Sequence, residues 1–148
     1  MTARISIQSE DFDIAAESVA LTNGRTDIGA VVTFSGLVRA DDGLASLTLE
    51  HYPGMTEREI ARHVAEAQAR WPLLGVTVIH RIGKLAPGAR IVMVAVAAAH
   101  RASAFEAANF LMDYLKTRAP FWKLEERAGK GEWVDAKAED DDAAKRWE

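Results

Sequence analysis

The sequence contains no cysteine among its 148 residues. This absence excludes disulfide bonds, zinc sites built from thiolates and a cysteine nucleophile. Any reaction of this protein that involves sulfur must therefore use sulfur that another molecule brings. The histidines show no HExxH spacing and no second cluster of ligands, so we interpret His51 and His63 as structural and predict no metal site.

Long apolar runs and an excess of positive charge are also absent. No hydrophobic run is long enough to span a membrane, and the first residues lack the cationic start and apolar core of a signal peptide. The sequence therefore favours a cytoplasmic protein without a membrane segment. A net charge of −4 and a pI near 5.6 disfavour a general nucleic-acid surface, which depends on a broad excess of positive charge.

The apolar content is sufficient for one hydrophobic core. Hydrophobic residues make up 49% of the chain, and its length is typical of one domain, residues 1–148. No internal repeat, linker or phosphate-binding glycine loop divides or marks the sequence. The acidic run 139–142 leads us to expect an acidic, solvated tail at 138–148.

The periodicity of apolar residues predicts an α+β protein with mostly antiparallel strands. The strand at 44–52 is expected to pair with the strand before it across a hairpin. Ser9 is the expected cap of the first helix, and Thr56 with Glu59 is expected to form a capping box for the second. Strands are predicted at 4–8, 28–38, 44–52, 76–82, 91–98, 121–125 and 133–137, and helices between Ser9 and Asn23, between Thr56 and Trp71, and from Phe105 to about Arg118.

The main functional signal lies in the stretch 111–123, which reads LMDYLKTRAPFWK. Helical spacing ends near Arg118, because Pro120 lacks an N–H and restricts the residue before it. An alternating strand then returns Lys123 beside Lys116, which predicts a site for a small anion. As an alternative, cations in a last helical turn suit the helix dipole; this accounts for Lys116 and Arg118 but not for Lys123.

Other cations stand at the ends of predicted elements. Arg39 follows the strand 28–38, where a solvated arginine is the ordinary interpretation. His100 and Arg101 lie between a strand and the long helix, near exposed helix N–H groups that favour an anion. A capping histidine beside a solvated arginine is the alternative there. Arg127 adds a further positive charge near the end of the following strand.

Several strings of residues resemble one known family. MDYLKTRAPFWK is long and unusual, and the sequence also contains FSGLVR at 34–39, LEHYPGMTE at 49–57, HRIGKLAPG at 80–88, AHR at 99–101 and a closing WVDAK and AAKRW. These strings span nearly the whole chain in the order of the family. The sequence resembles the large, catalytic subunit of molybdopterin synthase.

This resemblance implies a fold, a reaction and partners. The implied fold is an α/β hammerhead with three main helices, in a homodimer that binds one small ubiquitin-like sulfur carrier at each outer end to form a heterotetramer. The carrier's Gly-Gly C-terminus, as a thiocarboxylate, would enter a pocket of this chain. Two such sulfurs would convert cyclic pyranopterin monophosphate into the dithiolene molybdopterin, with no cofactor held by the chain.

The resemblance also assigns roles to residues. Lys116 and Lys123 would be catalytic: Lys116 would shuttle protons or attack the carrier carbonyl, and Lys123 would orient substrate and carrier carboxyl or act as an acid. Lys137 stands where relatives usually carry arginine, so the planar fork for phosphate is lost. The implied substrate-binding residues are Leu37, Val38, Arg39, His100, Arg101, Lys116, Lys123, Leu124 and Glu125, and the implied channel for the carrier tail passes Phe34, Met112 and Phe121.

Two other classes of function are compatible with parts of the sequence. A non-catalytic nucleotide- or RNA-binding module would also combine cations with aromatic residues, but it would spread basic charge over one face and expose stacking residues on a sheet. The net negative charge counts against this module. A purely structural partner of a ubiquitin-like protein would keep a carrier-binding surface and lose Lys116 or Arg39, and both residues are present.

Overall fold

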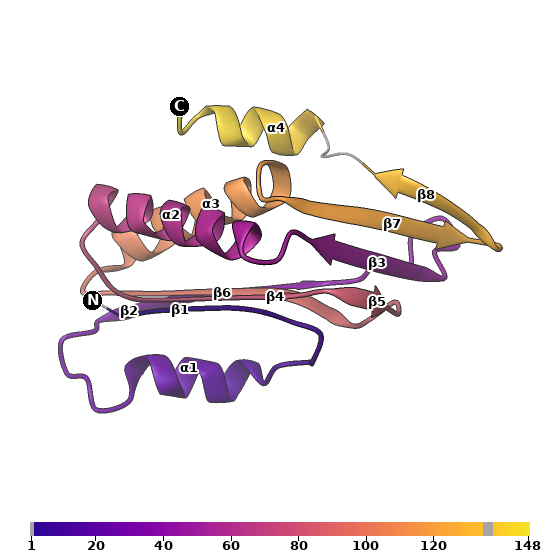
Figure 1. Cartoon of the computed structure of the whole chain (residues 1–148). Helices are drawn as coiled ribbons and strands as arrows, with labels where there is room; N and C mark the ends of the chain where they lie inside the picture. The colour runs from indigo at the N-terminus through magenta and orange to yellow at the C-terminus, as the bar shows by residue number, and fades with distance from the viewer. Residues whose placement is uncertain (1, 135–137) are drawn as a thin grey trace.

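Two four-stranded sheets and four helices make up the part of the chain that the computed structural model describes, residues 2–134 and 138–148 (Figure 1). The strands are β1 (Thr2–Gln8), β2 (Ala30–Leu37), β3 (Ser46–His51), β4 (Leu73–Arg81), β5 (Gly83–Leu85), β6 (Arg90–Ala98), β7 (Phe121–Arg127) and β8 (Lys130–Val134). The helices are α1 (Ile14–Thr22), α2 (Met55–Arg70), α3 (Arg101–Thr117) and α4 (Ala138–Lys145). None of the described helices is both long and apolar enough to cross a membrane.

The sheet β1-β4-β6-β2 has α2 and α3 on one face and α1 on the other (Figure 1). Because both faces are covered, its middle strands are apolar along most of their length. β6 is buried from Val92 to Ala98, which confirms the prediction of a central strand at 91–98. Among the strands of this sheet, β1 and β4 pair in parallel and the other pairs are antiparallel. The predicted α+β class with mostly antiparallel pairing is confirmed.

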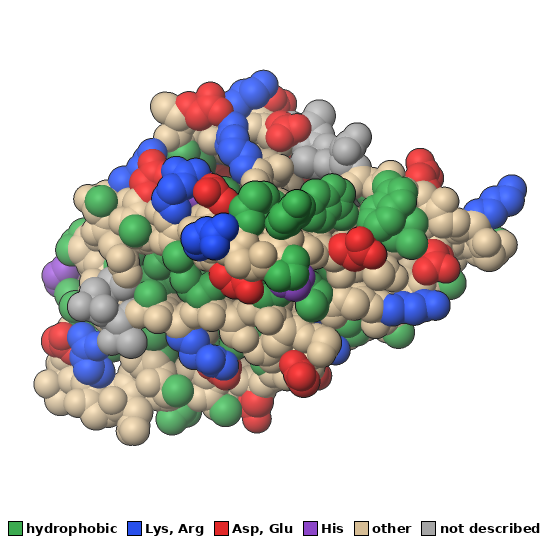
Figure 2. Space-filling view, in the orientation of Figure 1, with side chains coloured by type: hydrophobic (Ala, Val, Ile, Leu, Met, Phe, Trp, Pro, Cys, Tyr) green, Lys and Arg blue, Asp and Glu red, His purple; other side chains and the backbone are tan. Residues whose placement is uncertain are grey.

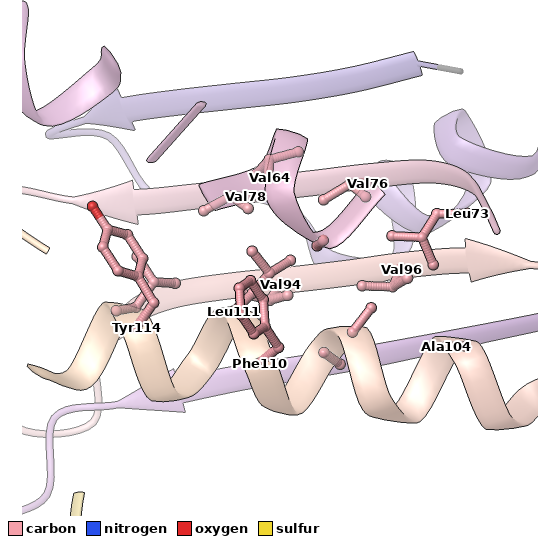
Figure 3. Close-up of a cluster of buried hydrophobic side chains, with 14 of the residues drawn as sticks. Val64, Leu73, Val76, Val78, Val94, Val96, Ala104, Phe110, Leu111 and Tyr114 are labelled. Atoms are coloured by element: carbon pink, nitrogen blue, oxygen red, sulfur yellow. The ribbon is translucent and has the colours of Figure 1, made fainter. Parts of the chain in front are cut away.

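Alternate residues of β4 and β6 face opposite sides of this sheet, so the sheet serves two hydrophobic clusters. Val78 and Val94 face α2 and α3 and pack with Leu111 in the larger cluster (Figure 3). Met93 faces the other side and packs with Phe12, which lies just before α1. The larger cluster fixes α3 on the sheet and thereby fixes where the last turn of α3 lies.

The second sheet, β5-β3-β7-β8, extends beyond the ends of α2 and α3 (Figure 1). Its inner face carries the buried residues Leu47, Leu49 and Leu85, which form a cluster with Val38. Ile91, at the start of β6, packs against the same cluster. The cluster joins this second sheet to the end of the central sheet.

The prediction that the strand at 44–52 pairs with its predecessor is wrong. β2 pairs with β6, whereas β3 pairs with β5 and β7. After β2, Val38 donates a backbone hydrogen bond to Ala89 (2.8 Å) and accepts one from Gly88 (2.7 Å), so the chain turns toward the β5–β6 loop instead of reversing along β2. Alternation specifies which face of a strand is buried, but it does not specify the neighbouring strand.

Both predicted helix caps are displaced. Asp13, not Ser9, caps α1 by accepting a hydrogen bond from the backbone N–H of Ala16 (3.0 Å). At α2 the carboxylate of Glu57 accepts from the N–H of Gly54 (3.0 Å), so the capping box expected at Thr56 and Glu59 is wrong. Gly54 has a φ of 84°, which a glycine adopts without the steric cost that a side chain imposes.

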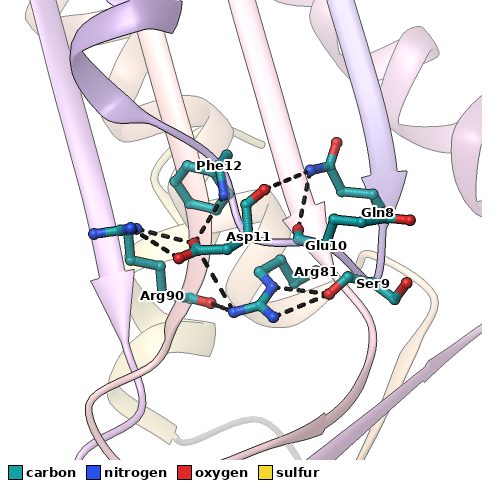
Figure 4. A network of polar contacts seen from close by, with 7 residues as sticks. All are labelled: Gln8, Ser9, Glu10, Asp11, Phe12, Arg81 and Arg90. Carbon is teal, nitrogen blue, oxygen red and sulfur yellow. Dashed lines mark hydrogen bonds and ion pairs between the residues drawn. The ribbon is translucent and has the colours of Figure 1, made fainter.

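The loop between β1 and α1 is held by two arginines (Figure 4). Arg90 binds both carboxylate oxygens of Asp11 at 3.0 and 2.8 Å, and this hydrogen bonding is the main reason why the pKa of Asp11 lies below its ordinary value. Arg81 donates to the carbonyl oxygens of Ser9 (3.1 and 3.0 Å) and Arg90 (3.0 Å). Arg81 therefore has a structural role.

The segment 138–148 is not the solvated tail that the sequence predicted. It contains α4, a fourth helix beyond the three expected, and α4 packs on α3. Trp147 meets the rings of Trp71 and Phe110 at centroid distances of 5.6 Å, and its indole N–H donates to Asp113 at 2.5 Å. The acidic run lies at the start of this helix, and a buried Ala144 follows it. Of the strand predicted at 133–137, Trp133 and Val134 form the end of β8 (Lys130–Val134), and residues 135–137 lie outside the described residues.

We expect Asp113→Ala to loosen the C-terminal segment. The half-buried Asp113 carboxylate accepts hydrogen bonds from Arg146 (2.7 Å) and Trp147, and its loss leaves both donors without this acceptor. Urea unfolding should show a loss of about 1–3 kcal/mol. The control Asp142→Ala removes an exposed carboxylate 3.8 Å from Lys145 and should cost less than about 1 kcal/mol. Equal losses for both variants would contradict the anchoring role of Asp113.

Candidate functional site

A pocket of about 490 Å³ opens where the end of β2, the last turn of α3 and the strand β7 meet. It is the place where most of the residues assigned from the sequence come together. Seven of them line it: Phe34, Leu37, Val38, Arg39, Lys116, Lys123 and Glu125. Three of the cations assigned to the predicted anion site, Arg39, Lys116 and Lys123, therefore line one cavity.

The two lysines reach this pocket from consecutive elements. α3 ends at Thr117 with Arg118 as its cap, and the turn places Phe121 at the start of β7, as the proline predicted. Side chains alternate along β7, so Lys123 and Glu125 face the pocket while Leu124 faces away from it. Leu124 and Phe121 are thus the two β7 residues of the assigned set that do not line the pocket.

Arg127 also lines the pocket, although it was not assigned to the site from the sequence. Its guanidinium binds Glu125 (2.7 Å) and donates to the carbonyl oxygens of Asp42 (3.1 Å) and Asp41 (3.2 Å). Arg127 therefore ties β7 to the loop that carries Arg39. The alternation Lys123, Glu125, Arg127 on one face of β7 is the sequence signal that identifies it.

The charges of the pocket are mixed. Arg39 is exposed and pairs with Asp41 at 3.0 Å, and the acidic residues Glu139 and Asp140 of α4 also reach the wall. The cations therefore have acidic neighbours in the free protein. An anionic ligand would compete with these carboxylates for Arg39 and the two lysines.

His100 and Arg101 do not lie at this pocket in the same chain. Arg101 is the first residue of α3 and Lys116 lies in its last turn, so at a rise of about 1.5 Å per residue they are roughly 22 Å apart. The side chain of His100 precedes α3 but makes no capping hydrogen bond. Within one chain, these two residues and Lys116 belong to opposite ends of the helix.

Of the three expected channel residues, Phe34 lines the pocket, whereas Met112 and Phe121 pack against the main hydrophobic cluster. The ring of Phe121 stacks on His80, with centroids 3.9 Å apart. Lys137, the position with a lysine in place of arginine, lies outside the described residues.

His80 is a buried imidazole behind the lysines. It is 5% exposed, and its Nδ1–H donates to the carbonyl of Arg81 at 2.9 Å. Burial lowers the pKa of His80 from 6.5 to about 4, and the nearby charges of Lys123 and Lys116 act in the same direction. His80 is therefore neutral near pH 7, and it adds no positive charge below the pocket.

The remaining histidines give no metal site. His63 stacks on Tyr114 at a centroid distance of 3.4 Å and its Nδ1 lies 3.0 Å from the carbonyl oxygen of Glu59, so its role is structural. Across residues 2–134 and 138–148, no group of three or more His, Asp or Glu side chains is arranged to hold a metal ion.

The sequence matches a known family over most of its length. A family model described as MoaE protein matches residues 7–118. The chain is also 64% identical, over 146 residues, to the molybdopterin synthase catalytic subunit of Mesorhizobium japonicum, an alignment that covers 97% of this chain and 92% of that protein.

Solved structures give the same likeness. The molybdopterin biosynthesis MoaE protein from Burkholderia ambifaria superposes with a TM-score of 0.85 at 50% identity, covering 98% of this chain and 97% of that one. The molybdopterin synthase from Staphylococcus aureus superposes with a TM-score of 0.79 at 30% identity, covering 86% of this chain and 94% of that one.

The buried His80 should make stability depend on pH. Its pKa in the folded chain, about 4, is below the ordinary 6.5, so the unfolded chain binds more protons between these values. The contribution of neutral, buried His80 to the free energy of unfolding should therefore be fully present above pH 6.5. The free energy of unfolding should fall by roughly 3 kcal/mol as the pH drops toward 4. Urea unfolding of His80→Phe should lack this component, while the exposed control His100→Phe should retain it. A parental slope in His80→Phe would contradict the assignment.

Proposed function

The chain belongs to the MoaE family of molybdopterin synthase catalytic subunits, and we infer from this membership that it transfers sulfur from a small carrier protein to a pyranopterin. The sulfur comes from the thiocarboxylate at the Gly-Gly C-terminus of a ubiquitin-like carrier subunit. The acceptor is cyclic pyranopterin monophosphate, and the product is the dithiolene molybdopterin. Its location in the cytoplasm stays a prediction from the sequence.

The observation that carries this proposal is the pocket between β2, α3 and β7. It presents Arg39, Lys116 and Lys123 around one cavity. A cyclic phosphate and an approaching thiocarboxylate both bring negative charge, and fixed cations offset that charge while the phosphate ring opens. The chain has no cysteine, so the sulfur must arrive on the carrier.

We propose distinct roles for the cations of this pocket. Arg39, on the loop after β2, binds the phosphate. Lys116 either shuttles protons or attacks the carrier carbonyl, and Lys123 orients the substrate and the carrier carboxyl or acts as an acid. Each transfer moves one sulfur atom and leaves the carrier with an ordinary carboxylate after hydrolysis, so two carrier molecules are used for each dithiolene.

A homodimer would bring His100 and Arg101 into this scheme. β2 is an edge strand, and the large apolar residues Val31, Phe34 and Leu37 are exposed on it. Antiparallel pairing of two β2 strands would place the Ala30 end of one beside the Leu37 end of the other.

The start of α3 lies near the Ala30 end of β2, because Ala30 pairs with Ala98. The proposed pairing would therefore carry His100 and Arg101 of the partner subunit toward the pocket. In this arrangement each pocket would receive cations from both subunits. Arg101 would then act as a phosphate ligand across the interface.

The alternative of a nucleotide- or RNA-binding module is not favoured. Such a module needs an extended basic surface, whereas here the acidic residues Asp41, Glu125, Glu139 and Asp140 share the pocket wall with the cations. A compact, mixed-charge pocket suits one small anionic substrate.

We expect Lys116→Ala to abolish dithiolene formation without unfolding the protein. Lys116 is exposed on the last turn of α3 and its removal disturbs no core contact. In an anaerobic single-turnover assay with thiocarboxylated carrier and pyranopterin, the rate should fall by about 10²–10⁴-fold. The product is measured by fluorescence after oxidation, and thermal unfolding verifies the fold.

Two controls accompany this assay. Lys84→Ala removes an exposed lysine on β5, outside the pocket, and should keep the parental rate. Parental protein with a carrier that ends in an ordinary carboxylate should give no product. Product from the carboxylate carrier without another sulfur source would refute the sulfur-transfer proposal, and a parental rate in Lys116→Ala would refute the role of Lys116.

The dimer predicts a change in mass on substitution of its apolar surface. Phe105, on α3 and 57% exposed, should lie at the interface beside β2. Phe105→Asp should shift sedimentation from a dimer toward the 16.2 kDa monomer at micromolar concentration, because it buries a charge in an apolar contact. Val19→Asp, on the opposite side of the central sheet, should leave the dimer intact. A parental protein that sediments as a monomer would exclude this interface.

A further inference from the structure

The connection between α3 and β7 sets the relation of the two lysines. It consists of residues 118–120, between the last turn that carries Lys116 and the strand that carries Lys123. Within it, the backbone N–H groups of Arg118 and Ala119 both donate to the backbone carbonyl oxygen of Tyr114, at 2.8 and 3.1 Å. A shift of this connection changes the separation of the two side chains in the pocket.

Thr56 contacts this connection from another helix. It lies in the first turn of α2 and is fully buried. Its hydroxyl donates to the carbonyl oxygen of Pro120 at 3.0 Å and accepts from the backbone N–H of Tyr52 at 2.9 Å. A threonine hydroxyl can donate one hydrogen bond and accept others, so both functions of this group are used here.

The two partners of this hydroxyl flank neighbouring strands. Tyr52 directly follows β3, and Pro120 directly precedes β7. β3 and β7 pair with His51 opposite Phe121 and Leu49 opposite Lys123. The Thr56 hydroxyl therefore joins the two chain segments at the end of this strand pair, and its acceptor Pro120 lies three residues before Lys123.

We propose that Thr56 is a positioning residue for sulfur transfer, which holds the Pro120 carbonyl and so fixes Lys123 relative to Lys116; this inference rests on the proposed function. The next residue, Phe121, is held by the stacking of its ring on His80. Thr56 itself contacts no reacting atom and acts through the turn. Small displacements of catalytic groups are costly because the reacting atoms must meet at short range.

The test compares Thr56→Val, which keeps the shape but removes the hydroxyl, with Thr56→Ser, which keeps the hydroxyl. In the thiocarboxylate assay kcat should fall by about 10–100-fold in Thr56→Val and should return close to the parental value in Thr56→Ser. The matched control is Thr77→Val, because Thr77 is also buried but lies on β4 away from the turn. Its kcat should remain parental.

Hydrogen exchange gives a second readout that does not need turnover. The backbone N–H groups of residues 118, 119 and 121–123 should exchange faster in Thr56→Val than in the parental protein, and Thr77→Val should leave them unchanged. If Thr56→Val does not fold, Thr56→Cys takes its place, because a thiol is a weak donor and should give an intermediate rate.

The outcomes separate this inference from the proposed function. A folded Thr56→Val or Thr56→Cys with parental kcat and parental exchange at 118–123 would overturn the positioning role, and so would an equal loss in Thr77→Val. If the parental protein itself gives no product with thiocarboxylated carrier, the proposed function fails, and the exchange data alone decide whether Thr56 holds the turn.

Discussion

Pro120 imposes the constraint on which the pocket depends. A proline has no N–H to continue a helix and disfavours helical geometry in the residue before it, so α3 must stop and the chain must leave its axis. The chain continues as β7, which pairs with β3 and carries Lys123 back toward the last turn of α3. The two lysines line one pocket because of this break. The strand that follows the break, β7, pairs with β3 and β8 in the second sheet.

Two effects limit the positive charge around the pocket: burial keeps His80 neutral, and Arg127 is paired with Glu125. The imidazole of His80 has a pKa of about 4 mainly because it is buried, so it stays neutral beneath two lysines. Arg127 donates hydrogen bonds to Glu125 and to two backbone carbonyls, and these bonds hold the loop that follows β2. The cations that line the pocket beside it are Arg39, at 76% side-chain exposure, the exposed Lys116 and the half-buried Lys123. These are the groups on which an incoming anion can act.

The ends and positions of single helices and strands were predictable from the sequence, whereas the segments that they pair with or pack against were often not. The end of α3, the return of β7 and the central place of β6 follow from a proline and from apolar periodicity. The neighbour of β3 and the docking of α4 depend on contacts between distant segments. Trp147 and Asp113 are 34 residues apart, and no periodic pattern joins them. The caps failed for a related reason, because serine and threonine suit several local hydrogen-bonded structures.

The residues of the candidate site were likewise predictable only in part from the sequence. The cations and their alternation on β7 identify Lys116, Lys123 and Glu125, and the structure gathers them in one pocket. Leu124 was assigned by likeness alone, and the alternation of β7 turns it to the other face. The sequence placed His100 and Arg101 at the start of the long helix and Lys116 near its end. It could not show which of these residues line one pocket, because the neighbours of a pocket are set by tertiary structure. His100 and Arg101 reach the pocket only if another subunit supplies them.

A single chain lacks the sulfur donor that the reaction of the family requires. The chain offers cations but no thiol to carry sulfur, because it has no cysteine. Acidic residues share the pocket wall with these cations and weaken their field when no ligand is bound. A partner that brings a thiocarboxylate adds the sulfur and the negative charge together, at the same end of one extended tail. A pocket that holds its cations rigidly before this tail arrives has little ordering left to perform on binding. The turn at Pro120 ends α3 and starts β7, so it sets the spacing of the two lysines on which the proposed reaction depends.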